Sequence, residues 1–201
     1  ELVVVGAPIA VSFLLEYGLF SAGGLLMGLI STSALAAHQI ALQIAAILFM
    51  VPFGISMAAT VRVGQAFGRG ELPAIRRAGV AAIVLGIVFM SVMTLAVIVA
   101  RFDLARFFFG DSPPGLAAVD LAATLMLVGA TFFIADGIQT VAAGALRGLS
   151  DTRIPLLLAA LSYWAIGFTS ACALAFWISL GAVGIWIGLS IGTGLYAILL
   201  V

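Results

Sequence analysis

The sequence has little charge and no lysine. Eight arginines and eight acidic residues give a charged fraction of 8% and a formal net charge of zero. This balance indicates neither nucleic acid nor an acidic substrate as a partner. The single cysteine, Cys172, lies inside an apolar run, where small hydrophobic packing is expected, and a lone cysteine excludes an internal disulfide.

Motifs for enzymatic chemistry are also missing. One histidine and one cysteine cannot form a metal-ligand cluster of those residues, and the sequence contains no nucleophile elbow. The arginines and glycines between Arg62 and Arg77 match neither a Walker loop nor a dinucleotide fingerprint, so anchoring at a membrane face is the preferred interpretation. We therefore expect no enzyme, no ATP site and no cofactor.

Apolar residues dominate the chain. Of its 201 residues 65% are hydrophobic, and the mean hydropathy is +1.35, more than a water-soluble core needs. A membrane-spanning helix takes about 20 mainly apolar residues. The sequence predicts an all-α integral membrane protein with six transmembrane helices, at residues 5–30, 34–60, 79–100, 116–147, 154–178 and 181–201.

The connections between these spans are short and leave no room for a soluble domain. The chain starts at Glu1 rather than Met and enters an apolar span almost at once, so we expect it to be part of a longer protein.

Arginines are unevenly distributed among the connections. The second and fourth connections hold Arg62, Arg69, Arg76, Arg77, Arg147 and Arg153. The third holds Arg101 and Arg106, which are offset by Asp103 and Asp111. Because positive residues in short loops stay cytoplasmic, the second and fourth connections and both chain ends are predicted to face the cytoplasm.

Two carboxylates, Glu16 and Asp136, lie deep within predicted spans. At a rise of about 1.5 Å per residue, Asp136 is about 16 Å from Arg147 and Glu16 about 12 Å from Pro8, which puts both towards the midplane. A charged side chain at that depth costs about 2.5–3.5 kcal/mol on insertion scales and usually marks a functional site. The pair predicts an ion-coupled transporter in which neighbouring helices share one cation.

Three polar side chains lie one helical turn from these carboxylates, and two more share one face of the second predicted span. They are Ser12, Gln39, Gln43, Gln139 and Thr140. Oxygen ligands suit a hard cation such as Na⁺, whereas burial and mutual repulsion of two carboxylates favour a proton, so the sequence leaves Na⁺ and H⁺ open. Each supporting group has an alternative interpretation as an interhelical hydrogen bond.

His38 and Asp120 lie near the outer starts of spans two and four. For His38, a hydrogen-bonded position in a helix interface is preferred over a role as a proton relay. Asp120 is favoured by the helix dipole and can reach water, so we do not expect it to be a site residue.

Several stretches resemble the multidrug and toxic compound extrusion transporters, in particular the carboxy-terminal six-helix lobe of the NorM-like bacterial branch. They are GAPIAVSFLLEYGLF, AAHQIALQIAAILFMVPFGISMAATVRVGQAFGRG, ADGIQTVAAGALRGLSDTRIP and GAVGIWIGLSIG. They cover most of the chain in the order that the family keeps.

The resemblance implies a twelve-helix protein of two lobes in the bacterial cytoplasmic (inner) membrane, with this chain supplying helices seven to twelve. Glu16 and Asp136 match the two acidic positions that this branch uses for coupling cations. Some relatives have a tyrosine one turn before the aspartate, where this chain has Phe132. The implied activity is export of amphipathic, mostly cationic drugs in exchange for Na⁺ or H⁺.

The partners implied by this resemblance are membrane lipid, organic-cation substrates and an amino-terminal lobe of the same polypeptide. The lobes would rock around a central cavity. Candidate substrate-cavity residues are Phe132, Tyr163 and Trp164, because aromatic rings attract organic cations.

Two other functions remain as alternatives. A lipid-linked oligosaccharide flippase of the same superfamily would need a basic cavity, whereas all eight arginines here fall at span ends, which predicts an acidic one. In a channel or structural membrane subunit, Glu16 and Asp136 would be packing groups.

Overall fold

The computed structural model describes residues 2–110 and 113–201, so Glu1 and Asp111 lie outside the described residues. All regular elements within these ranges are helical, which confirms the expected all-α class. Five helices are long and apolar enough to cross a membrane, and a bent pair raises this number to six in the described part of the chain.

The first three helices are long. They are α1 (Leu2–Ile30), α2 (Thr32–Gly68) and α3 (Leu72–Phe109). Helices α2 and α3 extend well beyond the predicted spans 34–60 and 79–100. The apolar stretch ends where polar side chains begin, but the helical backbone hydrogen bonds continue past that point. Helix α2 ends at a tight turn, in which Gly70 has a φ of 70°.

The fourth predicted span, 116–147, is a broken helix. It consists of α4 (Pro113–Val128) and α5 (Ala130–Gly148), which meet at Gly129 with a bend of 47° between Ala118–Val128 and Ala130–Gly148. A β-carbon at Gly129 would lie 2.7 Å from the ring of Trp186, so only glycine allows this close approach.

The fifth predicted span, 154–178, is continuous but changes its winding. It runs through α6 (Arg153–Ala159), the π-helical η1 (Ala160–Phe168), α7 (Thr169–Cys172) and the π-helical η2 (Ala173–Trp177). The sixth is α8 (Gly181–Leu200). Wider π turns are rare and are often found at functional sites.

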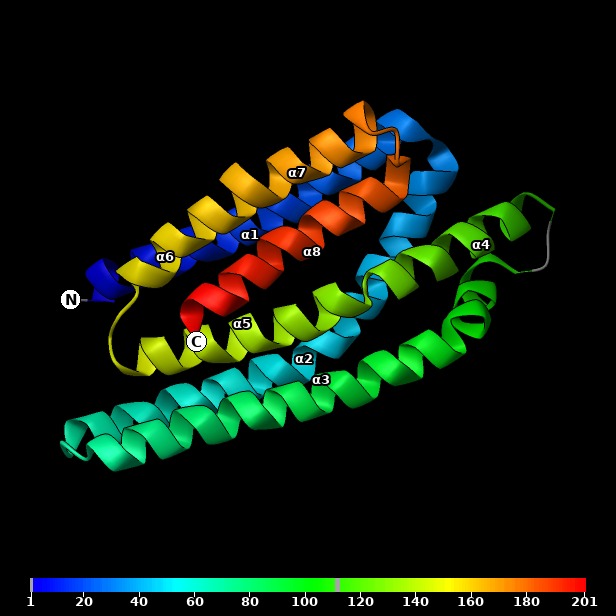
Figure 1. Ribbon diagram of the computed structural model, residues 1–201. Coiled ribbons are helices and arrows are strands. Elements are labelled where there is room, and N and C mark those ends of the chain that lie inside the picture. Colours follow the sequence, from blue (N-terminus) through cyan, green and yellow to red (C-terminus); the bar gives the residue numbers. More distant parts are fainter. Residues whose placement is uncertain (1, 111–112) are drawn as a thin grey trace.

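The helices form one bundle with α5 near its centre (Figure 1). Helix α5 packs against α2, α3 and α8, and α1 packs against α2, α6, η1 and α8. The chain ends, the α2–α3 connection and the α5–α6 connection lie at one end of the bundle in Figure 1. Six of the eight arginines lie on these connections or beside them, and we call this the arginine-rich end.

Small residues allow the close packing. A β-carbon at Gly144 of α5 would meet Ser56 of α2, and one at Gly188 of α8 would meet Ala171 of α7. Large apolar side chains such as Leu14, Val99 and Trp177 are instead exposed on the outside of the bundle. This arrangement suits a bundle in lipid, where small residues let helix backbones approach one another.

Candidate functional site

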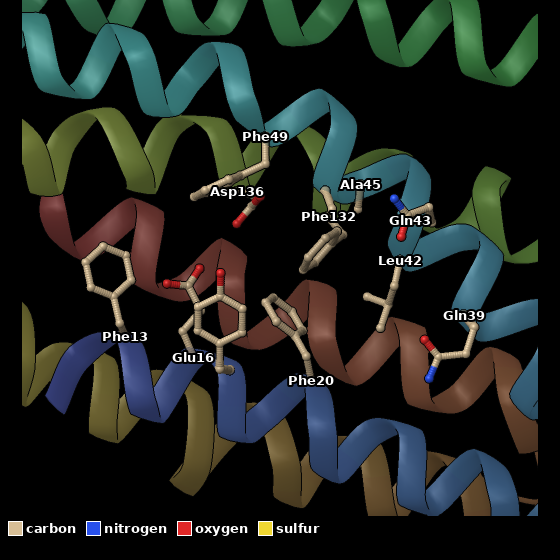
Figure 2. Close-up of a pocket in the computed structure, with 12 residues that line it drawn as sticks. Phe13, Glu16, Phe20, Gln39, Leu42, Gln43, Ala45, Phe49, Phe132 and Asp136 are labelled. Atoms are coloured by element: carbon tan, nitrogen blue, oxygen red, sulfur yellow. The ribbon is translucent and has the colours of Figure 1, made fainter. Parts of the chain in front are cut away.

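The side chains of Glu16 and Asp136 come from α1 and α5 and point into the same space between these helices (Figure 2). Asp136 is buried, with 6% of its surface exposed, and Glu16 is half-buried. The structure therefore brings together two carboxylates that are 120 residues apart in sequence.

Gln139 connects the two carboxylates. Its amide nitrogen Nε2 donates to Oε1 of Glu16 at 3.0 Å and to Oδ1 of Asp136 at 2.9 Å. Because both oxygens lie about 3 Å from one nitrogen, they are at most about 6 Å apart. An amide NH₂ has two donors, and both are used here.

Tyr163 of η1 fixes the orientation of this amide. Its hydroxyl donates to Oε1 of Gln139, which leaves the NH₂ group facing the carboxylates. Gln139 and Tyr163 are both buried, at 2% exposure each. Three elements, α1, α5 and η1, thus meet in one hydrogen-bonded network.

A cavity of about 260 Å³ opens beside the carboxylates. Most of its wall is apolar and aromatic, and Figure 2 shows Glu16 and Asp136 near one end and Gln39 towards the other. We call it the acidic cavity; it is lined by Phe13, Glu16, Tyr17, Phe20, Gln39, Leu42, Gln43, Ala45, Ala46, Phe49, Phe132 and Asp136.

The other polar residues singled out from the sequence lie around this cavity rather than at its centre. Gln39 and Gln43 line its wall on α2. The hydroxyl of Ser12 donates to the backbone oxygen of Pro8 at 2.9 Å, so it serves its own helix. Thr140 lies in a second, smaller cavity that is described below.

The three aromatic candidates take different positions. Phe132 lines the acidic cavity and packs edge-on against Phe20 and Trp186. Tyr163 lies behind Gln139, outside that cavity wall. Trp164 is 37% exposed and donates from its indole nitrogen to the backbone oxygen of Leu15, which ties η1 to α1.

The second cavity, of about 20 Å³, lies on the other side of Glu16 and contains an arginine. Arg147 and Tyr196 line it together with Glu16, Gln139, Tyr163 and other residues of α1, α2, α5 and α6. The sequence placed Arg147 at a span end, as its position in the last turn of α5 confirms, but did not predict that it reaches a cavity. In the sequence, the length of the arginine side chain was the one feature that could have indicated this contact with the cavity.

His38 is fully buried, and its Nδ1 accepts a hydrogen bond from the indole nitrogen of Trp186 at 3.1 Å. This geometry agrees with the preferred interpretation of His38 as part of a helix interface.

Glu16 and Asp136 supply the oxygens that could hold a small cation. Within the described residues, no group of three or more His, Cys, Asp and Glu could bind a metal ion. A Na⁺ ion held between two carboxylates would need further ligands from neutral oxygens or water.

Comparisons with known proteins agree with this architecture. The chain matches the MatE family over residues 8–172. It is 63% identical over all 201 residues to a probable multidrug resistance protein NorM of Bradyrhizobium diazoefficiens, and 57% identical to one of Rhodopseudomonas palustris. It covers 43% and 42% of these two relatives, so it spans less than half their length.

The fold is similar to that of solved transporters. The crystal structure of the eukaryotic MATE transporter AtDTX14 superposes with a TM-score of 0.91 at 25% identity, covering 100% of this chain and 44% of that one. MATE multidrug transporters are secondary transporters and not enzymes, as the sequence led us to expect. From the match over residues 8–172 and the NorM relatives, the chain belongs to the MatE family and corresponds to about half of a MATE transporter.

Proposed function

We propose that the transporter to which this chain contributes one six-helix lobe exports amphipathic organic cations in exchange for Na⁺ or H⁺. Glu16 and Asp136 bind the coupling cation in this mechanism. The observation that carries the proposal is the geometry of these carboxylates, which lie on separate helices, share one amide donor and face an apolar cavity.

The energetics of buried charge support a coupling role. Two carboxylates at most about 6 Å apart in a largely apolar bundle repel each other when both are ionised. A Na⁺ ion or a proton relieves that repulsion. Gln139 donates to both carboxylates but carries no net charge, so it positions the pair without neutralising it.

The lining of the acidic cavity supports a cationic, amphipathic substrate. Aromatic rings from Phe13, Phe20 and Phe49 form much of its wall, and the two carboxylates supply negative charge. Apolar surface and cation–π contact both favour an organic cation. No arginine is among the described residues that line this cavity, whereas a flippase for an anionic lipid would need positive charge there.

The coupling cation and the organic cation compete for the negative charge of Glu16 and Asp136, and this competition couples their transport. A cation shifts the transporter between conformations only by binding one of them more tightly than the other. Cation binding at Glu16 and Asp136 removes the negative charge that an organic cation needs, and so promotes release of the drug. Downhill entry of the cation then drives uphill export.

The placement of the chain in the membrane is part of the proposal. We assign it to the carboxy-terminal lobe, helices seven to twelve, in the bacterial cytoplasmic membrane with both ends cytoplasmic. The arginine-rich end supports this orientation, since positive residues in short connections stay in the cytoplasm.

The test is efflux of a fluorescent organic cation from proteoliposomes that contain the full-length parent protein. A Na⁺ or a pH gradient is imposed, and wild type is compared with Glu16→Gln and Asp136→Asn. Matched controls are Glu71→Gln and Asp120→Asn, because both of these acidic residues are exposed.

We expect one gradient to drive export by wild type and by both control variants, while Glu16→Gln and Asp136→Asn lose gradient-driven export. Normal export by the two site variants would place the coupling site elsewhere. Downhill flux alone, with no uphill export by wild type, would instead support a channel.

A further inference from the structure

Arg147 is a half-buried cation close to the acidic site. It lies in the last turn of α5 and is intermediate in exposure. Its guanidinium carbon lies 5.3 Å from the centre of the Phe13 ring on α1. Because Phe13 is one helical turn from Glu16, the cation–π contact holds the guanidinium on the same part of α1 as the glutamate.

The small cavity lies between Arg147 and Glu16. At about 20 Å³ it has room for about one water molecule. No direct ion pair joins the two residues, since no nitrogen of Arg147 lies within 4.0 Å of a carboxylate oxygen of Glu16. The other titratable side chains that line this cavity are Tyr163 and Tyr196.

Glu16 thus lines two cavities, one with a second carboxylate and the other with an arginine. On one side is the acidic cavity, which it shares with Asp136. On the other side is the small cavity, which it shares with Arg147 and which lies towards the arginine-rich end. A cation that moved from the carboxylates into the small cavity would therefore meet a fixed positive charge.

The charge of Arg147 is permanent, because a guanidinium is not deprotonated in proteins. Inside a bundle with a reduced effective dielectric constant, it attracts the Glu16 carboxylate and repels a cation bound there. It consequently stabilises Glu16 after the coupling cation has left and lowers the affinity of the site for that cation.

We propose that Arg147 is a resident counter-charge for Glu16, which promotes release of the coupling cation and opposes the uncoupled passage of cations through the small cavity. This role rests on the proposed function, because it requires a cation at Glu16 and Asp136. In this role, Arg147 both lowers the affinity of the site for the coupling cation and prevents uncoupled cation flux.

The experiment uses the full-length parent protein with Arg147→Gln, Arg147→Met and Arg147→Lys. Methionine keeps an apolar stem against Phe13, so it serves as a second neutral variant if Arg147→Gln does not fold. Arg153→Gln is the matched control, because Arg153 is exposed at the same end. Two quantities are measured: the half-saturating Na⁺ concentration or pH for export, and cation flux through proteoliposomes without substrate.

Both neutral variants are expected to bind the coupling cation about tenfold more tightly, as removal of a nearby opposite charge from a carboxylate site predicts. They are also expected to leak cations without substrate. Arg147→Lys and Arg153→Gln should behave as wild type does, since each keeps a positive charge at position 147.

Three results would overturn the role. Neutral variants with unchanged cation affinity and no leak would refute the counter-charge while gradient-driven export by wild type still supported the proposed function. An equal shift in Arg147→Lys would show that the shape of the side chain matters and its charge does not. A wild-type protein that uses neither cation would overturn the proposed function and this role with it.

Discussion

Replacement of Gln139 by methionine tests the network at the centre of the site. The substitution keeps a similar length and volume but removes two donated bonds, to Glu16 and Asp136, and one accepted from Tyr163. Interhelical hydrogen bonds in membrane proteins average about 0.6 kcal/mol, and bonds to charged groups in proteins reach about 1.5–3 kcal/mol. We therefore expect Gln139→Met to lower the free energy of unfolding by about 2 kcal/mol.

The assay is thermal unfolding of the full-length parent in detergent, followed by intrinsic fluorescence. Gln65→Met on α2 is the matched control, because Gln65 is exposed, and its effect should stay within about 0.5 kcal/mol. A double-mutant cycle of Gln139→Met with Tyr163→Phe should show coupling, since the two side chains share one bond. The reasoning is refuted if Gln139→Met and Gln65→Met unfold alike and the cycle is additive.

Two further substitutions test packing, each against a control in the same class of residue. Gly188→Ala should lower the free energy of unfolding by about 1–3 kcal/mol, because the new β-carbon would overlap Ala171. The control is Gly194→Ala on the same helix, whose β-carbon would meet nothing within 4 Å and which should be neutral or slightly stabilising. Equal unfolding temperatures for these two variants would contradict the close approach of α8 to α7. Trp186→Phe removes the hydrogen-bond donor to Nδ1 of His38 and should lower the free energy of unfolding by about 1–3 kcal/mol. Its control is Trp177→Phe at an 86% exposed position, which should change the free energy of unfolding by less than about 0.5 kcal/mol. A destabilised Trp177→Phe with an unaffected Trp186→Phe would reverse the assignment of buried and lipid-facing tryptophans.

The energetic cost of burial is what made part of this site predictable. Glu16 and Asp136 stood out because a carboxylate deep in an apolar span needs a reason to be there. Gln139 was included because it is one turn from Asp136. Hydropathy likewise predicted the all-α membrane class, which the structure confirms, although it could not show where α2 and α3 end.

The remaining features depend on which helices become neighbours, and local sequence carries no such signal. Tyr163 meets Gln139 only because η1 packs beside α1 and α8. Arg147 turns towards Phe13 because an aromatic ring from another helix lies within its reach. The bend at Gly129 lies in the run Leu127-Val128-Gly129-Ala130, which reads as uninterrupted helix until Trp186 is placed against it.

Helix α5 joins α4 at the bend at Gly129, and the site residues Asp136 and Gln139 lie far along α5 from this bend. Asp136 is about 10 Å along the helix axis from Gly129 and Gln139 about 15 Å, at a rise of about 1.5 Å per residue. A rotation of α5 by about 10° about Gly129 would displace Gln139 by about 2.5 Å. Its distance to Asp136 would not change, because both residues lie on α5. The hydrogen bond from Gln139 to Glu16 links α5 to α1. A rotation of α5 about Gly129 would therefore change the distance between the carboxylates of Glu16 and Asp136.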